Sequence, residues 1–346
     1  MSTNSGEASL GQTDVRRVCV LFPGALGDFV CFLPALHELA RLDAVDLIAR
    51  SEFAAIAPRT VTVHSLERSE VRQLFTDAGA TDPRVRQFFS RYAAVFSWFA
   101  SDQLIFAEQL QKVSHGCANI FPFRPKNSFI HQADYYLSCV DPDLPKAAQP
   151  LVALRADALL WCDSFCRRTE IDNTPLLVMA PGSGAREKNW PEANYVQLAR
   201  WWREQFVGHV VVVMGPVEME RHRFDQLASL GCIVASELDL AQLASLLSRC
   251  NVYVGNDSGV SHLAAAVGAR TVAIFGPSDE RKWAPRGPRV SIVRRQVACS
   301  PCDDTAMKLC PHRACLTQLT SAEVIHELRK LPEIANLTRL RVEITV

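Results

Sequence analysis

Four residues in the second half of the chain could belong to a site for an anion: Asp257, Ser258, Gly259 and His262. Ser258 and His262 lie four residues apart, so on a helix they would share one face, where both could donate hydrogen bonds to an anionic oxygen. Gly259 would let a ligand approach the backbone closely. The alternative is that Asp257 or Ser258 only caps a helix, and that His262 is a buried histidine whose hydrogen bonds are satisfied within the protein.

The elements expected around these residues would aim them out of a parallel sheet. A buried strand is predicted over Val252–Gly255, a helix over Val260–Val267 and a second buried strand over Thr271–Phe275. This is most of a βαβ unit, in which the helix begins at the carboxyl end of a strand. The unpaired N–H groups of its first turn and the positive end of its dipole would form a seat for a phosphate.

A second candidate for phosphate binding follows the predicted strand Leu176–Ala180. The small-residue loop after this strand contains Ser183 and Gly184, and Lys188 precedes a helix predicted over Glu192–Phe206. Backbone N–H groups of such a loop can hold an anion, and a lysine supplies a point charge. The alternative is an ordinary connection between a strand and a helix, with an exposed lysine.

Asp28 is the candidate for acid–base chemistry. It follows a predicted buried strand, Arg17–Phe22, and precedes an apolar helix predicted over Phe29–Leu39. The connection lacks both the G-x-G-x-x-G fingerprint and the Walker lysine, so neither a dinucleotide site nor a P-loop is supported. A carboxylate at the edge of a domain could take a proton from a hydroxyl group, whereas a capping or first-turn acid is the alternative.

The composition is that of an ordinary globular protein. The chain has 346 residues, of which 48% are hydrophobic and 21% charged, which is enough for two α/β domains. Lysine plus arginine (37) equals aspartate plus glutamate (37), so no overall charge would attract nucleic acid. No stretch has the apolar character of a signal peptide or a membrane span. We therefore expect a cytoplasmic protein, which could still work peripherally at the cytoplasmic membrane.

The alternation of strands and helices, over a chain of this length, predicts two Rossmann-like α/β domains with parallel sheets. Further strands are expected at Ala44–Ile48, Thr60–His64, Ala93–Phe99 and His209–Gly215. We expect a disordered leader over 1–15, an N-terminal domain over 16–172, a C-terminal domain over 173–331 and a tail over 332–346. Between 101 and 148 the pattern loosens and no motif can be interpreted; Arg124 could meet an acidic acceptor, although a solvated charge is the commoner role.

Three blocks together resemble glycosyltransferase family 9, the ADP-heptose:lipopolysaccharide heptosyltransferases. The run D-S-G-x-x-H-L-A-A-A-x-G-x-x-T-V-A-I-F-G-P at 257–277 is similar to the donor-site signature of that family. P-G-S-x-x-x-x-K-x-W-P at 181–191 and Gly27-Asp28 with Pro34 are similar to two further blocks. The resemblance covers most of the chain from Val18 to about Leu328, and departs at Ser258, where the best-known members have threonine.

This resemblance implies the GT-B fold, in which the acceptor-side domain, 16–172, and the nucleotide-sugar-binding domain, 173–331, face each other across a cleft. It also implies an inverting transfer of a sugar, heptose, from a nucleotide-diphosphate donor, ADP-heptose. The acceptor would be a hydroxyl of the lipopolysaccharide core or of a related glycan. Asp28 would act as the general base. Glu218 would bind the ribose, although Glu220 could serve the same end. Leu238 would form an apolar wall for the nucleobase. The implied donor-binding residues are Ser183, Gly184, Lys188, Glu218, Leu238, Asp257, Ser258, Gly259 and His262. No cofactor would be required beyond the donor itself.

Two other functions remain open from the sequence. The chain could use another nucleotide sugar, as relatives within this family do, or it could be a non-catalytic nucleotide-binding protein that retains the donor pocket. A dehydrogenase fits less well, because no glycine fingerprint with an acidic ribose partner follows the first strand. The presence of Asp28 favours an enzyme over a binding module.

Four of the twelve cysteines form a cluster: Cys299, Cys302, Cys310 and Cys315. Four thiols are enough for a tetrahedral zinc site, but the spacing C-x2-C-x7-C-x4-C is not a standard zinc-ribbon pattern. Free thiols or an adventitious disulfide are the alternatives. The remaining eight cysteines are scattered, and several lie in apolar segments where a thiol serves as a small core residue.

Overall fold

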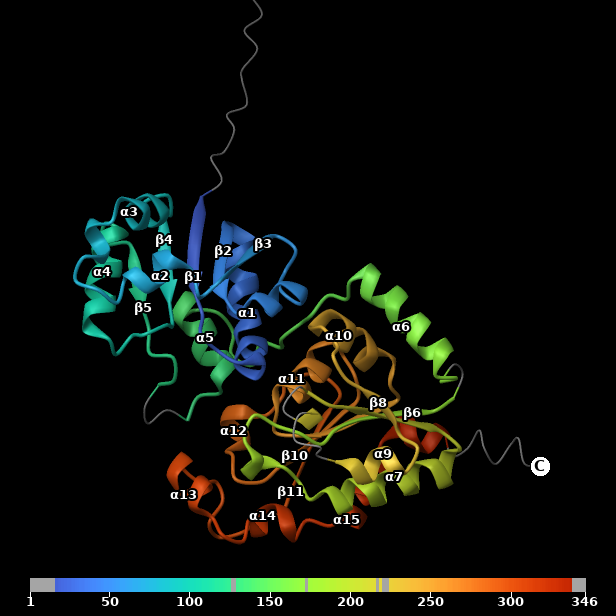
Figure 1. Ribbon diagram of the computed structural model, residues 1–346. Coiled ribbons are helices and arrows are strands. Elements are labelled where there is room, and N and C mark those ends of the chain that lie inside the picture. The colour runs from blue at the N-terminus through green and yellow to red at the C-terminus, as the bar shows by residue number, and fades with distance from the viewer. Residues whose placement is uncertain (1–15, 126–128, 172–173, 216–217, 220–223, 338–346) are drawn as a thin grey trace, which may run out of the picture.

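The structure is a computed structural model that describes residues 16–125, 129–171, 174–215, 218–219 and 224–337 (Figure 1). The predicted leader over 1–15, the end of the predicted tail, 338–346, and Glu220, the alternative to Glu218, lie outside the described residues. The described residues form an N-terminal half and a C-terminal half, each built on one sheet of parallel strands.

The N-terminal half contains a five-stranded sheet in the order β3-β2-β1-β4-β5. Its strands are β1 (Arg17–Leu21), β2 (Ala44–Ala49), β3 (Val61–Ser65), β4 (Ala94–Ser97) and β5 (Ala118–Ile120). All neighbouring strands pair in parallel, as with Val18 opposite Val45 and Ala94. The strand order reverses between β1 and β4, and ligands of open α/β sheets bind at the carboxyl ends of the strands beside such a reversal.

The C-terminal half contains a six-stranded sheet in the order β11-β10-β9-β6-β7-β8. Its strands are β6 (Leu176–Ala180), β7 (His209–Val213), β8 (Ile233–Ala235), β9 (Val252–Asn256), β10 (Thr271–Phe275) and β11 (Val290–Arg294). These pairs are parallel too, and the order reverses between β6 and β9. Both sheets therefore have the doubly wound, Rossmann-like order, and the predicted α/β fold with two such units is confirmed.

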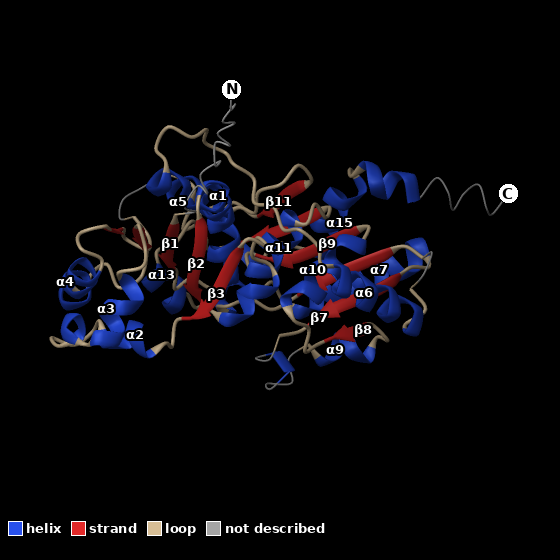
Figure 2. Cartoon of the chain, turned by 90° about the horizontal axis from the view of Figure 1, so that it is seen from above, coloured by secondary structure: helices blue, strands red, loops and turns tan. Residues whose placement is uncertain are grey.

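Helices cover both faces of each sheet (Figures 1 and 2). In the N-terminal half they are α1 (Leu26–Leu42), α2 (Ser69–Gln73), α3 (Pro83–Phe89), α4 (Leu104–Val113) and α5 (Gln132–Val140), with 3-10 turns at Ser51–Ala55 and Gly79–Thr81. The connecting helix is α6 (Ala156–Arg168). In the C-terminal half they are α7 (Glu192–Phe206), α9 (Asp225–Ser229), α10 (Leu240–Arg249), α11 (Gly259–Ala266), α12 (Glu280–Trp283), α13 (Asp304–Leu309), α14 (Ala314–Thr317) and α15 (Ser321–Arg329), with a 3-10 turn at Arg186–Lys188.

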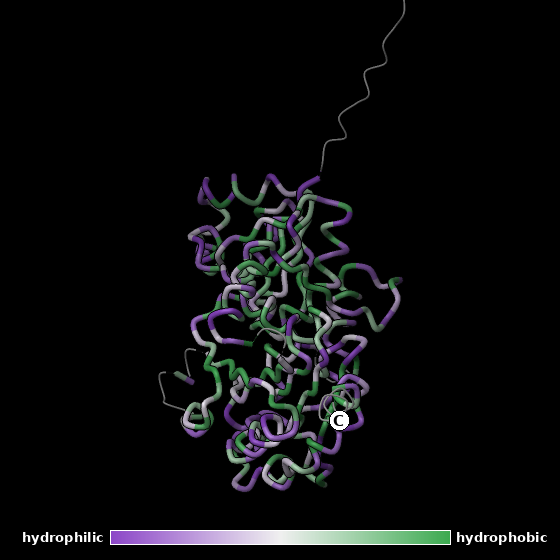
Figure 3. The backbone as a smooth tube through the Cα atoms, turned by 90° about the vertical axis from the view of Figure 1, so that its right-hand side faces the viewer, coloured by the Kyte–Doolittle hydropathy of each residue, from purple (hydrophilic) through white to green (hydrophobic). Residues whose placement is uncertain are grey.

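Alternating residues of the strands feed apolar clusters on opposite faces of each sheet. In β1, Val18 and Val20 belong to one cluster, whereas Cys19 and Leu21 belong to another. The first of these clusters runs from the N-terminal sheet through α1, α5 and α11 into the C-terminal sheet, so the two halves share apolar contacts. Figure 3 shows the hydrophobic stretches of the chain passing through the interior of both halves.

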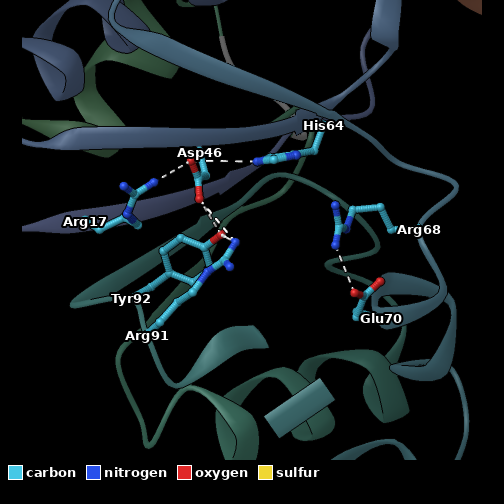
Figure 4. A network of polar contacts seen from close by, with 7 residues as sticks. All are labelled: Arg17, Asp46, His64, Arg68, Glu70, Arg91 and Tyr92. Atoms are coloured by element: carbon cyan, nitrogen blue, oxygen red, sulfur yellow. Dashed lines mark hydrogen bonds and ion pairs between the residues drawn. The ribbon is translucent and has the colours of Figure 1, made fainter. Parts of the chain in front are cut away.

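A buried carboxylate in β2, Asp46, is neutralised entirely within the N-terminal half (Figure 4). Its Oδ1 accepts a hydrogen bond from Arg17 Nη1 at 2.9 Å, and its Oδ2 accepts from Tyr92 Oη at 2.7 Å and from Arg91 Nη2 at 3.3 Å. His64 Nε2 lies 3.7 Å from Oδ1. Buried charges need such partners, so this network stabilises the fold.

The structure differs from the sequence expectations mainly at the ends of elements. The first helix begins at Leu26, so Asp28 lies inside its first turn and not in the preceding connection. Between 101 and 148, where no pattern could be interpreted, the structure contains α4, β5 and α5. Several of the buried positions of α5 are polar, among them Gln132 and Asp134, which weakens the helical pattern of hydrophobic residues.

The connecting helix α6 packs against α10, so it lies with the C-terminal half (Figure 1). The predicted boundary between 172 and 173 remains a prediction, and the first residues of the predicted tail, 332–337, are helical. None of the helices in the described ranges is both long enough and apolar enough to cross a membrane.

Candidate active-site cleft

A cleft of about 380 Å³ lies between the two halves and is lined by residues from both. Seven of the residues predicted from the sequence line it: Asp28, Gly184, Lys188, Asp257, Ser258, Gly259 and His262. The cleft lies beside the reversals of strand order in both sheets, at the carboxyl ends of β1, β6 and β9. That is where open α/β sheets bind their ligands.

The N-termini of α1 and α11 meet at the floor of the cleft. A Cβ atom added to Gly259 would lie 2.8 Å from Leu26 Cβ and 2.9 Å from Gly27 N, so only a glycine permits this approach. The first turns of two helices, one from each half, therefore open toward the same space. Their unpaired N–H groups and dipoles favour an anion there.

Asp28 lies on the N-terminal side of the cleft and is 7% exposed. Arg124 Nη2 donates to both of its oxygens, at 3.1 Å to Oδ1 and 3.3 Å to Oδ2. The guanidinium of Arg124 also lies over the ring of Trp283 from the C-terminal half, 4.8 Å from its centroid. Ala25 N, at the start of α1, donates to Oδ2 as well, at 3.3 Å. The carboxylate therefore has one backbone partner, as expected of a first-turn acid, and one side-chain partner, an arginine that bridges the mouth of the cleft.

Lys188 lies on the opposite side of the cleft, where its Nζ donates to Asp257 Oδ2 at 2.8 Å. The loop that carries Lys188 is fixed by the buried side chain of Asn256, at the end of β9. Asn256 Oδ1 accepts hydrogen bonds from Trp190 N and Tyr195 Oη, both at 3.0 Å, and its Nδ2 donates to the carbonyl of Pro181 at 2.7 Å. The two predicted phosphate-binding loops are thereby joined into one unit.

Ser258 and His262 lie next to each other at the start of α11. Ser258 does not cap the helix with its side chain, and its buried Oγ has no hydrogen-bond partner among the described residues. Burial lowers the pKa of His262 to about 4, so its ring is neutral at pH 7. Its Nδ1 lies 3.6 Å from Cys31 Sγ, across the boundary between the halves. Ser258 lines the cleft, but its hydroxyl must rotate outward to meet a ligand, whereas His262 mainly fills the boundary.

Three predicted donor-site residues do not line this cleft. Ser183 Oγ lies 2.6 Å from both Ala185 O and Asn189 Oδ1, so it braces its own loop. Glu218 packs against Gly182, and its Oε2 accepts a hydrogen bond from Gly215 N at 3.1 Å. Leu238 packs, partly buried, against the apolar cluster that the two halves share. Their proposed roles in binding depend on a ligand that extends beyond the cleft.

Other lining residues had weak signals or none in the sequence. Asp279, Lys282 and Trp283, from the segment after β10 and from α12, line the cleft. Arg124, for which a solvated charge was given as the commoner role, is 53% exposed and also reaches Asp28. Cys302, Asp304 and Met307 belong to the cysteine-rich loop, which no motif linked to the cleft.

The cysteine-rich loop is held under the cleft by its backbone and by Ser300. Cys302 N donates to Pro277 O at 2.8 Å, and Ser300 Oγ donates to Gly276 O at 2.6 Å. Cys299, Cys302, Cys310 and Cys315 are free thiols. Within the described ranges, no group of three or more His, Cys, Asp or Glu side chains is arranged to hold a metal ion, so the structure gives no support to the zinc alternative.

The arrangement offers two complementary chemical functions. On the C-terminal side, Lys188, the hydroxyl of Ser258 and the start of α11 can bind and stabilise an anionic group. On the N-terminal side, Asp28 presents a carboxylate that can accept a proton. When a chemical group is transferred to a hydroxyl and an anion leaves, one side of the site must stabilise the leaving anion and the other must take the proton of the hydroxyl. The two sides of this cleft offer these two functions.

Comparisons with known proteins agree with this description. The family model of glycosyltransferase family 9 (heptosyltransferase) matches residues 140–311. Lipopolysaccharide heptosyltransferase 2 of Salmonella typhimurium is 30% identical over 165 residues, which are 44% of this chain and 45% of that protein. The chain thus spans about half the length of the curated relatives that it matches.

Solved structures resemble the chain over nearly its whole length. The glycosyl transferase family 9 protein from Veillonella parvula has a TM-score of 0.73 and 17% identity, covering 92% of this chain and 98% of that one. An E. coli heptosyltransferase solved with ADP-2-deoxy-2-fluoro heptose has a TM-score of 0.61 and 19% identity, covering 91% and 99%. At this level of identity the likeness shows the fold alone, and it confirms the GT-B architecture.

Proposed function

Because the chain belongs to glycosyltransferase family 9, we propose that it transfers a sugar from a nucleotide-diphosphate donor to a hydroxyl of a glycan acceptor, with inversion at the anomeric carbon. Heptose from ADP-heptose is the proposed donor group, and the lipopolysaccharide core or a related glycolipid is the proposed acceptor. The heptosyltransferase relatives and the sugar-nucleotide analogue bound to one of them support this choice. We propose a cytoplasmic site of action, with peripheral contact at the membrane that carries the acceptor.

The observation that carries the proposal is the pairing of Lys188 and Asp28 across one cleft. The donor diphosphate would lie at the start of α11, where Lys188, Ser258 Oγ and backbone N–H groups meet its charge. As the glycosidic bond breaks, negative charge grows on the leaving diphosphate, and these groups stabilise it. Lys282, which also lines the cleft, adds a second cation.

Asp28 would act from the opposite face of the sugar. The acceptor hydroxyl attacks the anomeric carbon while Asp28 takes its proton, and one displacement of this kind inverts the configuration. In the structure the carboxylate is held by Arg124, so an acceptor hydroxyl must share or replace that contact. Asp28 therefore has a position suited to the acceptor and not to the nucleotide.

We propose that Asp257 acts through Lys188. A second carboxylate beside a diphosphate would repel it, whereas the 2.8 Å contact with Asp257 holds the lysine over the start of α11. Loss of Asp257 should thus weaken nucleotide binding by releasing Lys188. Ser183 would have a similar supporting role, because its hydroxyl contacts only the loop to which it belongs in the described structure.

Donor turnover tests the proposal. ADP release from ADP-heptose should depend on an acceptor of the lipid A–Kdo type and should exceed release from UDP- or GDP-sugars. The product should show the opposite anomeric configuration from the donor by NMR. Binding of ADP without any turnover would instead identify a non-catalytic nucleotide-binding protein, and turnover of another nucleotide sugar would keep the mechanism but change the donor.

A further inference from the structure

The contact between the two halves includes an ion pair that the proposed chemistry does not use. Arg286 follows α12 in the C-terminal half, and Asp134 lies in the first turn of α5 in the N-terminal half. Arg286 Nη1 donates to Asp134 Oδ1 at 2.6 Å and Nη2 donates to Oδ2 at 2.7 Å. The side chains are 20% and 8% exposed, so this is a two-pronged, largely buried pair.

A second contact lies beside this pair. The ring of His131 accepts a hydrogen bond at Nδ1 from Ala133 N, at 3.1 Å, so its proton resides on Nε2. Nε2 then donates to the carbonyl of Ala284, 2.9 Å away in the C-terminal half. Burial, followed by the charge of Arg286, lowers the pKa of His131 to about 4, so this donor stays neutral and in place at pH 7.

Both partners of the ion pair are rigidly held within their own halves. Asp134 Oδ1 also accepts from Ala147 N at 2.8 Å, and α5 packs along α1, the helix that carries Asp28. On the other side, a Cβ atom on Gly287 would lie 2.9 Å from the carbonyl oxygen of Ala265, so the segment after Arg286 rests directly on α11. The ion pair therefore joins the helix of the proposed base to the helix of the proposed donor site.

We propose that Asp134, Arg286 and His131 form an interdomain latch that fixes the position of Asp28 relative to the donor site. The three residues would contact neither the donor nor the acceptor, so they are positioning residues. A carboxylate that must meet a hydroxyl at the anomeric carbon tolerates little displacement, because a shift of about 1 Å can cost about 100-fold in rate. The side chains proposed to bind the nucleotide, Lys188, Ser258 and Lys282, by contrast, all belong to the C-terminal half.

The latch is tested first by a measurement that does not depend on any substrate. Asp134→Asn and Arg286→Met should enlarge the radius of gyration in small-angle X-ray scattering and speed amide exchange in α5 and in 284–287. Glu333→Gln is the control for the loss of a carboxylate from an ion pair, because Glu333 pairs with Arg270 at 2.7 Å within the C-terminal half. Unchanged scattering and exchange in both latch variants would overturn the proposal.

Kinetics supply the second readout, and this part rests on the proposed function. With ADP-heptose as donor, Asp134→Asn should lower kcat by about 10- to 100-fold while the Kd for ADP changes less than about threefold. Arg286→Lys, which keeps the charge but loses the two-pronged contact, should fall between this variant and the wild type. Equal losses in kcat and nucleotide affinity would mean a damaged donor pocket and would contradict the latch. If the wild type transfers no sugar, the proposed function fails, while scattering and exchange still decide on the latch.

Discussion

Two aspartates of the N-terminal half are buried to a similar degree, yet their surroundings differ. Asp46 is 2% exposed and Asp28 is 7% exposed. Asp46 lies within the sheet and is contacted by Arg17, Arg91 and Tyr92, all from the same half. Asp28 lies at the carboxyl edge of that sheet, and Arg124 is the one side chain for which a hydrogen bond to it is found in the described residues.

The comparison separates a carboxylate that supports the fold from one that is suited to chemistry. The partners of Asp46 surround it on several sides, so the carboxylate has no room for a ligand. The partner of Asp28 is 53% exposed and also leans on Trp283 of the other half, so a ligand that enters the cleft can displace it. Burial of a charged side chain alone therefore does not indicate a functional site. A buried carboxylate is suited to bind a ligand when the side chain that pairs with it can be displaced.

The largest effect is expected from Asp28→Asn. Loss of the proposed general base should lower the rate of transfer by about 10³-fold, whereas the melting temperature and the Kd for ADP should hardly change. Asp43→Asn is the control, because Asp43 caps the other end of the same helix, α1, and its replacement should leave the activity unchanged. Turnover of Asp28→Asn near the wild-type rate would show that Asp28 is not the base.

Asp46→Ala should have the opposite profile. Removal of the buried carboxylate leaves Arg17, Arg91 and Tyr92 without their acceptor, so the free energy of unfolding should fall by about 3 kcal/mol. Urea denaturation measures this loss. The rate of transfer per folded molecule should stay near that of the wild type. A loss of kcat without a loss of stability would show that Asp46 takes part in the reaction.

Lys188→Ala should weaken nucleotide binding and leave the fold intact. Because a charged hydrogen bond contributes about 1.5–3 kcal/mol, the Kd for ADP should rise by about 10- to 100-fold in calorimetry. Lys330→Ala removes a surface pair with Glu327 and serves as the control for the loss of a positive charge. An unchanged Kd in Lys188→Ala would remove this residue from the donor site.

The smallest effect concerns pH. Burial lowers the pKa values of His131 and His262 to about 4, from an ordinary value of 6.5. As the pH falls, these histidines therefore take up protons in the unfolded chain before they do so in the folded protein. The free energy of unfolding should decrease from about pH 6.5 down to about pH 4, and the loss at pH 6 should be about 1 kcal/mol per histidine. Thermal melts of His262→Gln should show a shallower pH dependence than those of the wild type, and an equally steep dependence would contradict the low pKa of His262.

Much of the fold could be predicted from the sequence because local patterns carry it. Buried β-branched runs such as Val210–Val213 and the stretch around Asp257–Gly259 specify strands and turns through nearest neighbours. The strand-to-helix connections then place Asp28, Lys188 and Ser258 at carboxyl ends of strands, where such sheets bind ligands. The sequence thus determined which loops would meet and what charge they would bring.

Only the tertiary structure decided how these loops are held. Arg124 follows a segment with no periodic pattern, and its contact with Asp28 spans 96 positions of the chain. The pair of Asp134 and Arg286 spans 152 positions, and its members look like ordinary surface charges when read in order. Side-chain pairing across the two halves depends on distances that no local pattern encodes, since it arises only after both sheets have packed against α1 and α11.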